Sequence, residues 1–89
     1  MNNTTKWEDI SFIISSEYRK NVLKTLDSPK MPSKISKELN INKTHISKTL
    51  KELKLKKLIK CLTPNSNKGK LYKISDHGKD ILKEISNLK

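Results

Sequence analysis

The stretch of residues 42–60 carries seven lysines and a single acidic residue, Glu52, with small hydroxyl side chains among them. Lysine ammonium groups bind phosphate oxygens, whereas hydroxyl and imidazole groups can exchange hydrogen bonds with base edges. At about 100° per residue, Ile46, Leu50 and Leu53 fall on one face of a helix. The opposite face holds the polar residues Thr44, Lys48 and Lys51, flanked by His45 and Ser47. Because acidic residues usually alternate with basic ones on a solvated face, this arrangement predicts a contact with nucleic acid.

A second basic group occupies the stretch PNSNKGKLYKIS, in which Lys68 and Lys70 flank Gly69. Proline, asparagine and glycine predict a polar loop between two short apolar runs. The lysines of both stretches are candidates to bind phosphates, and the hydroxyl and imidazole side chains are candidates to contact base edges. The full set of candidate contacts is Asn42, Lys43, Thr44, His45, Ser47, Lys48, Lys51, Lys68, Gly69 and Lys70.

The charge of the whole chain agrees with these local patterns. Its 89 residues include 20 basic and 9 acidic side chains, which gives a net charge of +11. That length supports one domain with a modest core, which we assign to residues 1–89. The excess positive charge favours a polyanionic partner. No apolar run approaches the roughly 20 residues that span a bilayer, and the first residues do not resemble a signal peptide. We therefore expect a cytoplasmic protein with no membrane partner.

The remaining chemically active side chains indicate neither a metal site nor catalysis. Cys61, His45 and His77 fall on separate elements without metal-ligand spacing. No phosphate-binding glycine loop and no nucleophile–base motif is present. Cys61 has the parity of an inward-facing strand residue, which predicts an inert core cysteine. We expect no cofactor, no metal and no enzymatic activity, and the sequence identifies no small-molecule effector.

Hydrophobic periodicity and turn residues divide the chain into helices and one hairpin. The expected elements are a helix over 6–27 with a candidate break at Ser15–Ser16, a helix over 32–39, a recognition helix over 43–57, a wing hairpin over 58–75 and a helix over 76–88. The second and third helices are joined so tightly that they form a helix-turn-helix. The fold class is therefore mainly α with a small β-hairpin: a winged helix-turn-helix with a two- or three-stranded antiparallel wing.

Two asparagines support this assignment of the turn. Asn40 tolerates the left-handed conformation that ends a helix. Asn42 is placed to begin the next helix by accepting a hydrogen bond from the backbone N–H of His45. A helix-turn-helix directs the start of its second helix toward the major groove, so the expected partner is double-stranded DNA.

Five short segments together resemble a known family. They are SEYRKNVL, PSKISKEL, HISKTLKEL, LIKCLTP and GKLYKIS, within residues 16–82. The chain resembles the small archaeal winged helix-turn-helix transcription regulators, which are related to MarR-like and ArsR-like repressors. This resemblance implies a third helix in the major groove, a wing along the backbone or minor groove, and a homodimer formed by the terminal helices.

The chain departs from the pattern of that family at three positions. Asn40 and Lys57 stand where glycine is usual, and a lysine in the left-handed conformation is strained. Leu55 falls on the exposed side of the recognition helix, where polar residues are usual, and nothing in the sequence explains it.

The terminal helices carry more apolar side chains than one small core requires. Either they fold over the domain, or they form the interface of a homodimer. The candidate interface residues are Ile10, Ile13, Ile14, Ile81, Ile85 and Leu88.

The sequence thus favours a sequence-specific, double-stranded DNA-binding transcription regulator. Two alternatives remain open. One is a sequence-neutral architectural protein, because the polar face is rich in lysine and lacks arginine. The other is a winged helix that binds acidic protein within a larger assembly.

Overall fold

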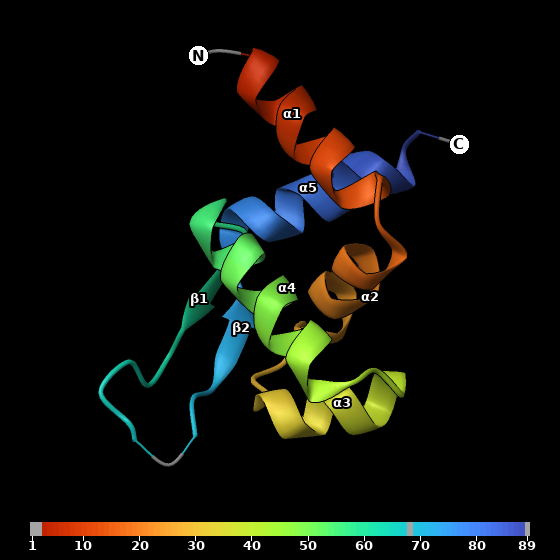
Figure 1. Ribbon diagram of the computed structural model, residues 1–89. Helices are drawn as coiled ribbons and strands as arrows, with labels where there is room; N and C mark the ends of the chain where they lie inside the picture. Colours follow the sequence, from red (N-terminus) through yellow and green to blue (C-terminus); the bar gives the residue numbers. More distant parts are fainter. Residues whose placement is uncertain (1–2, 68, 89) are drawn as a thin grey trace.

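The computed structural model describes residues 3–67 and 69–88, with side chains from residue 6 onward. Its elements are α1 (Asn3–Ile14), α2 (Glu17–Thr25), α3 (Pro32–Leu39), α4 (Lys43–Leu55), β1 (Ile59–Cys61), β2 (Tyr72–Ile74) and α5 (Asp76–Ser86). The prediction of a mainly α winged helix-turn-helix is confirmed. In Figure 1, α2, α3 and α4 form the three-helix body, the β1–β2 hairpin extends to one side, and α1 and α5 lie together at the opposite end from α3.

The helix expected over 6–27 is two helices, divided at the predicted break. Ser16 is extended (φ −145°, ψ 121°) and its Oγ accepts from the backbone N–H of Arg19. A serine in this conformation caps a new helix because its side chain satisfies an N–H that has no partner within the helix. The chain therefore changes direction between α1 and α2, so that α2 forms part of the three-helix body whereas α1 packs against α5 and α2 (Figure 1).

The turn between α3 and α4 is set by the two asparagines. Asn40 is left-handed (φ 54°), as predicted, and ends α3. The predicted cap by Asn42 needs a correction: its Oδ1 accepts from Thr44 N at 2.7 Å, not from His45. Both bonds satisfy a free N–H of the first helical turn, and the geometry of Asn42 (φ −54°, ψ 139°) brings the nearer one into reach.

The end of α4 comes earlier than the expected residue 57. Lys57 is left-handed (φ 62°), and its N–H donates to Lys54 O at 2.9 Å. The next residue, Leu58, donates to Leu53 O at 3.0 Å. These paired bonds are those of a Schellman motif, in which glycine normally occupies the left-handed position. Lys57 therefore adopts the left-handed conformation, which is strained for a lysine.

The wing is a short two-stranded antiparallel sheet with an added bridge. Ile59 pairs with Ile74 and Cys61 pairs with Tyr72. Lys30 forms an isolated bridge to Tyr72, with N–O distances of 3.0 and 2.9 Å. Cys61 is half-buried and lies outside the core cluster, so the expectation of a core cysteine was wrong. Cys61 is the last residue of β1, where the strand extends away from the core.

The core is formed by side chains from every helix and both strands. Its buried members are Ile10, Ile13, Val22, Leu23, Leu26, Ile35, Ile46, Leu50, Leu53, Leu58, Ile59, Ile74 and Ile81. Gly78 at the start of α5 is buried, and a Cβ there would overlap the carbonyl oxygen of Leu58. The start of α5 is thus pressed against the junction of α4 and β1. No helix in the described part of the chain is both long and apolar enough to traverse a bilayer.

Candidate nucleic-acid interface

The outward face of α4 is polar and basic along its length. Its inward face buries Ile46, Leu50 and Leu53. The outward side chains Thr44, His45, Ser47, Lys48 and Lys51 are all exposed. The structure therefore brings together on one surface the residues that periodicity assigned to it. Leu55 lies at the end of the same face with 79 % of its surface exposed, and nothing in this arrangement explains it.

Glu52, the one acidic residue of α4, does not face outward with these lysines. Its carboxylate accepts from Arg19 Nε on α2 at 3.3 Å, in a half-buried ion pair. The guanidinium of Arg19 also lies 3.9 Å above the ring of Phe12 and donates to the Phe12 carbonyl oxygen. The pair neutralises Glu52, so the outer face of α4 carries uncompensated positive charge.

Two polar residues at the start of α4 have structural partners. The ring of His45 stacks on Tyr18 of α2, with centroids 5.5 Å apart and planes at 30°. Asn42 uses its side-chain oxygen to cap the helix, which leaves its amide group able to donate. Lys43 and Thr44 are exposed beside this first turn, where free backbone N–H groups and the helix dipole favour an anion.

The wing approaches the start of α3 near its tip. A Cβ added to Gly69 would lie 3.0 Å from the sulfur of Met31, and Gly69 has φ +151°. The base of the loop is closed by Leu62 N donating to Leu71 O at 2.7 Å and Leu71 N donating to Thr63 Oγ1 at 2.9 Å. Lys70 is exposed, whereas Lys68 lies outside the described residues.

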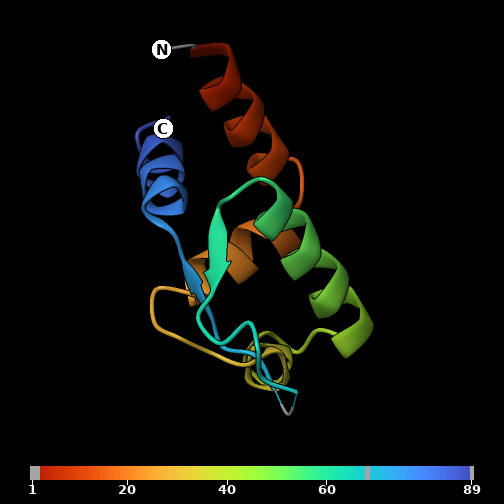
Figure 2. The same cartoon turned by 90° about the vertical axis from the view of Figure 1, so that its left-hand side faces the viewer.

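The wing tip, α3 and the first turn of α4 lie at the same end of the molecule. Figures 1 and 2 show this end at the bottom, with both chain termini at the top. α3 adds two exposed lysines, Lys34 and Lys37, which the candidate list lacked. The segment PSKISKEL could have identified both lysines, because they occupy polar positions of an amphipathic helix.

A third lysine near α3, Lys30, forms hydrogen bonds and an ion pair with neighbouring residues of the protein. Lys30 Nζ lies 3.0 Å from Glu38 Oε2, and Thr25 Oγ1 donates to the same carboxylate oxygen at 2.8 Å. The hydrogen bond from Thr25, followed by that from Lys30, holds the pKa of Glu38 below its ordinary value. This network ties the end of α2 to α3, so Lys30 serves the fold rather than the exposed basic surface.

The predicted dimer residues do not share one surface. Ile10, Ile13 and Ile81 are fully buried in the core of a single chain, so they cannot form an interface in this conformation. Ile14 and Leu88 are each 50 % exposed, and Ile85 is half-buried. Trp7 on α1 is 57 % exposed and was not among the predicted residues. Helical periodicity identified the apolar stripe but not whether the stripe meets the same chain or another one.

The described residues contain no group of three or more His, Cys, Asp or Glu side chains that could hold a metal ion. The buried carboxylate of Asp9 instead has two basic partners. It lies 2.6 Å from Nε2 of His77 and 3.7 Å from Nζ of Lys56. These contacts connect α1, the segment after α4, and α5.

The family model for the winged helix-turn-helix matches residues 15–89. That range includes most of the chain, so the protein belongs to the winged helix-turn-helix family. The comparison with curated proteins gives no match.

Solved structures with the same fold include MarR and ArsR relatives. A mutant MarR from E. coli, complexed with operator DNA, has a TM-score of 0.75 at 22% identity, covering 97% of this chain and 66% of that one. A mutant ZitR from Lactococcus lactis, in complex with DNA, has a TM-score of 0.68 at 23% identity and covers 81% of this chain. The chain spans about half of ZitR, 51% of its length.

A third similar structure is the homodimeric DNA-binding domain Mb0332 from Mycobacterium bovis, a possible ArsR-family transcriptional regulator. Its TM-score is 0.70 at 18% identity, covering 93% of this chain and 74% of that one. At these identities the three structures establish the shared fold.

Proposed function

We propose that this protein is a sequence-specific, double-stranded DNA-binding transcription regulator. In this proposal α4 enters the major groove and the wing lies along the backbone. The observation that carries it is the outer face of α4, which exposes lysines and hydroxyl groups while Arg19 neutralises Glu52. MarR and ZitR, which have the same fold, form complexes with DNA, and this supports a DNA-binding role.

The residues of the interface divide into two roles. Lys48, Lys51 and Lys70 neutralise phosphates, as would Lys68, which lies outside the described residues. Thr44 and Ser47 contact base edges, because they project from the first half of α4, where helix-turn-helix proteins make such contacts. His45 joins them with less freedom, since its ring already stacks on Tyr18.

The exposed surface of α3 extends the phosphate contacts. Lys34 and Lys37 lie on the first helix of the helix-turn-helix, which in such motifs crosses the DNA backbone. Asn42, Lys43 and Gly69 complete the surface around the first turn of α4 and the wing tip.

The active form in this proposal is a homodimer. The homodimeric state of the Mb0332 domain supports it. So do the exposed apolar side chains of Trp7, Ile14 and Leu88 on the terminal helices, together with the half-buried Ile85. A regulator of this kind works in the cytoplasm and has no catalytic role. We assign the protein to the archaeal subgroup because of the sequence resemblance.

Selection of binding sites from random duplex DNA tests this function. We expect an enriched site with two symmetric half-sites about 10 base pairs apart, because a two-fold dimer presents two α4 helices one helical turn apart. The selected duplex should bind at least about 1,000-fold more tightly than random duplex at the same salt concentration. Failure to enrich any sequence, with equal affinity for all duplexes, would refute sequence-specific regulation.

The sequence-neutral architectural alternative is favoured by one specific observation. The chain has a single arginine, and Arg19 is engaged by Glu52 and Phe12. Arginine makes the commonest specific contact to guanine and the usual contact in narrow minor grooves. The same selection separates the two functions, because an architectural protein binds random duplex as well as any selected one. Binding to heparin as tight as binding to duplex DNA would instead favour a protein-interaction module.

A further inference from the structure

Two lysines of the hairpin lie directly opposite each other. Lys60 of β1 pairs with Lys73 of β2 in the antiparallel register, and we call these two residues the lysine pair. Directly opposed side chains leave a sheet on the same face, with Cβ atoms about 4.5–5.5 Å apart. Like charges in this position are destabilising, so the lysine pair has a cost that the fold does not require.

The structure gives the lysine pair no acidic partner among the residues it describes. The ion pairs of these residues engage other bases, namely Lys6, Arg19, Lys30, Lys56 and His77. On the far side of β2, the bridge between Lys30 and Tyr72 brings the uncharged Pro29 next to Lys73. The charge of the pair is therefore not compensated within this part of the chain.

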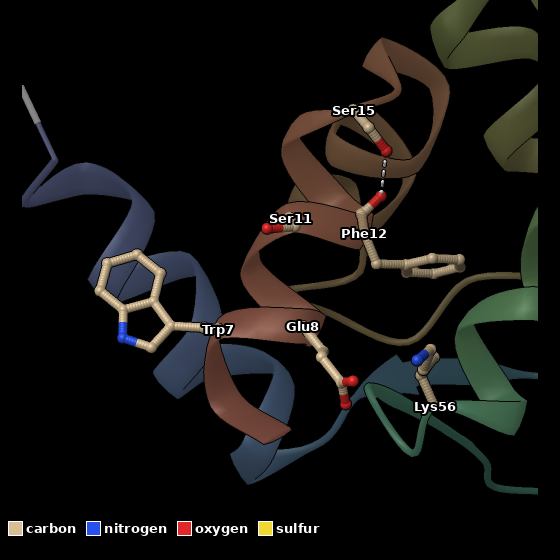
Figure 3. A pocket seen from close by; sticks show the side chains of 6 residues that line it. All are labelled: Trp7, Glu8, Ser11, Phe12, Ser15 and Lys56. Atoms are coloured by element: carbon tan, nitrogen blue, oxygen red, sulfur yellow. Dashed lines mark hydrogen bonds between the residues drawn. The ribbon is translucent and has the colours of Figure 1, made fainter. Parts of the chain in front are cut away.

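Lys56, four residues before Lys60, is by contrast neutralised by its own chain. Its Nζ lies 3.7 Å from Oδ1 of the buried Asp9 and 5.3 Å from the ring centroid of Phe12. Figure 3 shows the side chain of Lys56 on the same side of α1 as Glu8 and Phe12, where these residues line an open depression. A nearby lysine can thus find an internal partner, and the lysine pair differs from it.

A third lysine at the base of the hairpin also has a cost. Lys57 is exposed and left-handed (φ 62°), in a conformation that glycine adopts without strain. Its carbonyl oxygen accepts from Ser75 Oγ at 2.7 Å, which holds it beside the residue that follows β2. Two separate departures from the most stable choice therefore place positive charge on one hairpin. Strain that a fold retains in this way indicates a functional site, and here the charge indicates an anionic ligand.

The lysine pair points away from the core on a different side from the lysines of α4. Successive residues of a strand point to opposite faces, and Ile59 and Ile74 beside the pair are buried. The inward face of α4 is buried in the same core. In Figure 2, α4 lies at the right of the body and the two strands lie to its left. An anion at the pair therefore lies apart from a duplex held by the outward face of α4.

The next pair of residues toward the wing tip is apolar. Leu62 N donates to Leu71 O at 2.7 Å, and this pair continues the register on the same face as the lysine pair. Leu62 is 42% exposed and Leu71 is half-buried. A cationic pair beside an apolar pair suits a nucleic-acid backbone, in which phosphates alternate with sugars.

We propose that the lysine pair binds the phosphate backbone of a second duplex segment, so that one protein joins two segments of DNA. The ammonium groups of Lys60 and Lys73 donate to the oxygens of a phosphate, which removes their mutual repulsion. Lys57 adds to the positive potential at the base of the hairpin. The inference rests on the proposed function only for the first segment, which α4 holds.

The first test measures the repulsion and its relief without DNA. Lys60→Gln and Lys73→Gln each remove one charge, so each should raise the Tm by about 2–5 °C in dilute chloride buffer. Lys83→Gln, on the exposed surface of α5, is the matched control and should give no rise. Sodium phosphate at the same ionic strength should raise the Tm of the wild type more than that of either variant. An equal response to phosphate in the wild type and both variants would overturn the site.

The second test asks whether bound protein retains another duplex. One duplex is held on beads, saturated with protein and washed, and a labelled duplex of mixed sequence is then added. The wild type should retain the labelled duplex, and the double variant Lys60→Gln, Lys73→Gln should retain at least about tenfold less, because it lacks two phosphate contacts. The amount of double variant on the first duplex should match that of the wild type.

Three results would contradict this second site. In the first, the double variant retains as much labelled duplex as the wild type, or neither retains any. In the second, the double variant also leaves the first duplex, which would place the lysine pair in the interface of α4. In the third, polyglutamate is retained in preference to the labelled duplex, which would assign the face to an acidic protein.

These outcomes are distinct from those that test regulation. If the lysine pair is required to retain a second duplex but selection enriches no sequence, the proposed regulator is refuted and the second site stands. If selection enriches a sequence but no second duplex is retained, the second site is refuted and the regulator stands.

Discussion

Individual side chains decide what α4 presents to its partner. The ion pair of Glu52 with Arg19 removes the helix's own acidic group from the outer surface, and it does so between residues 33 positions apart. The ring of His45 stacks on Tyr18 and is therefore partly held in place, whereas the other exposed polar side chains of α4 project freely. The chemistry of this surface therefore depends on α2 as much as on α4.

Gly78 gives the clearest prediction about a single side chain. A Cβ at this position would overlap the Leu58 carbonyl oxygen and lie 2.7 Å from Cγ1 of Ile74. We expect Gly78→Ala to lower the free energy of unfolding by about 2–4 kcal/mol, because backbone must move to admit the methyl group. Urea denaturation measures the change, with the exposed neighbour Lys79→Ala as control. Equal stability of the two variants would show that the contact relaxes at no cost.

Lys57 should respond in the opposite direction. Its left-handed conformation (φ 62°) suits glycine, so Lys57→Gly should raise the free energy of unfolding by about 0.5–1 kcal/mol. Lys54→Gly, within α4, should instead destabilise by about 1 kcal/mol. Thermal or urea unfolding of the pair separates a favourable helix end from a general effect of glycine. A loss of stability in Lys57→Gly would mean that the lysine side chain has a stabilising role of its own.

At the scale of elements, the terminal helices are coupled to the recognition helix through one buried carboxylate. Asp9 of α1 is only 4% exposed and contacts His77 of α5 and Lys56 beyond α4. Replacing Asp9 by an uncharged residue would therefore remove a contact that α1, α5 and the segment after α4 share. The orientation of α1 therefore depends on this group.

A double-mutant cycle measures that connection. We expect His77→Ala to destabilise by about 1–3 kcal/mol, because it leaves a buried carboxylate with a weaker partner. With Asp9→Ala as the second change, the coupling energy should be about 0.5–3 kcal/mol. Chemical denaturation of the two single variants and the double variant provides the values. If the two substitutions have additive effects on the free energy of unfolding, the 2.6 Å contact between Asp9 and His77 adds no stabilisation of its own.

Local sequence signals predicted the elements well and their partners poorly. Pro32, Asn40 and Ser16 mark helix boundaries through backbone chemistry that acts within a few residues. The burial of Ile10 and Ile81 depends on how α1 and α5 are rotated on the body, which periodicity does not specify. The pair of Arg19 and Glu52 and the approach of Met31 to Gly69 join distant segments, so no spacing rule could identify them.

At the scale of the whole molecule, α3, the first turn of α4 and the wing tip, which carry exposed lysines, lie at the end opposite α1 (Figures 1 and 2). A net charge of +11 on one small domain attracts any duplex, so affinity alone does not distinguish a regulator from an architectural protein. The distinction lies in how affinity changes with salt and with DNA sequence.

The lysines should act mainly through salt-dependent binding. A lysine at a phosphate releases condensed counterions, so Lys48→Ala or Lys70→Ala should weaken binding to all sequences and lower the salt slope by about 1. Lys68→Ala should behave in the same way if the wing tip reaches the backbone. Lys83→Ala, on the exposed surface of α5, is the control and should leave the slope unchanged. Fluorescence anisotropy at several salt concentrations gives the slopes. An unchanged slope for Lys70→Ala would remove the wing from the interface.

The central claim is that α4 distinguishes one DNA sequence from another. The most direct measurement is the ratio of affinities for the selected and a scrambled duplex, at one salt concentration, for the wild type and for Thr44→Ala and Ser47→Ala. We predict that each variant reduces the ratio by a factor corresponding to about 1–3 kcal/mol, while its affinity for the scrambled duplex changes little. A ratio that stays the same in both variants, with affinity lost equally on both duplexes, would contradict base recognition by α4.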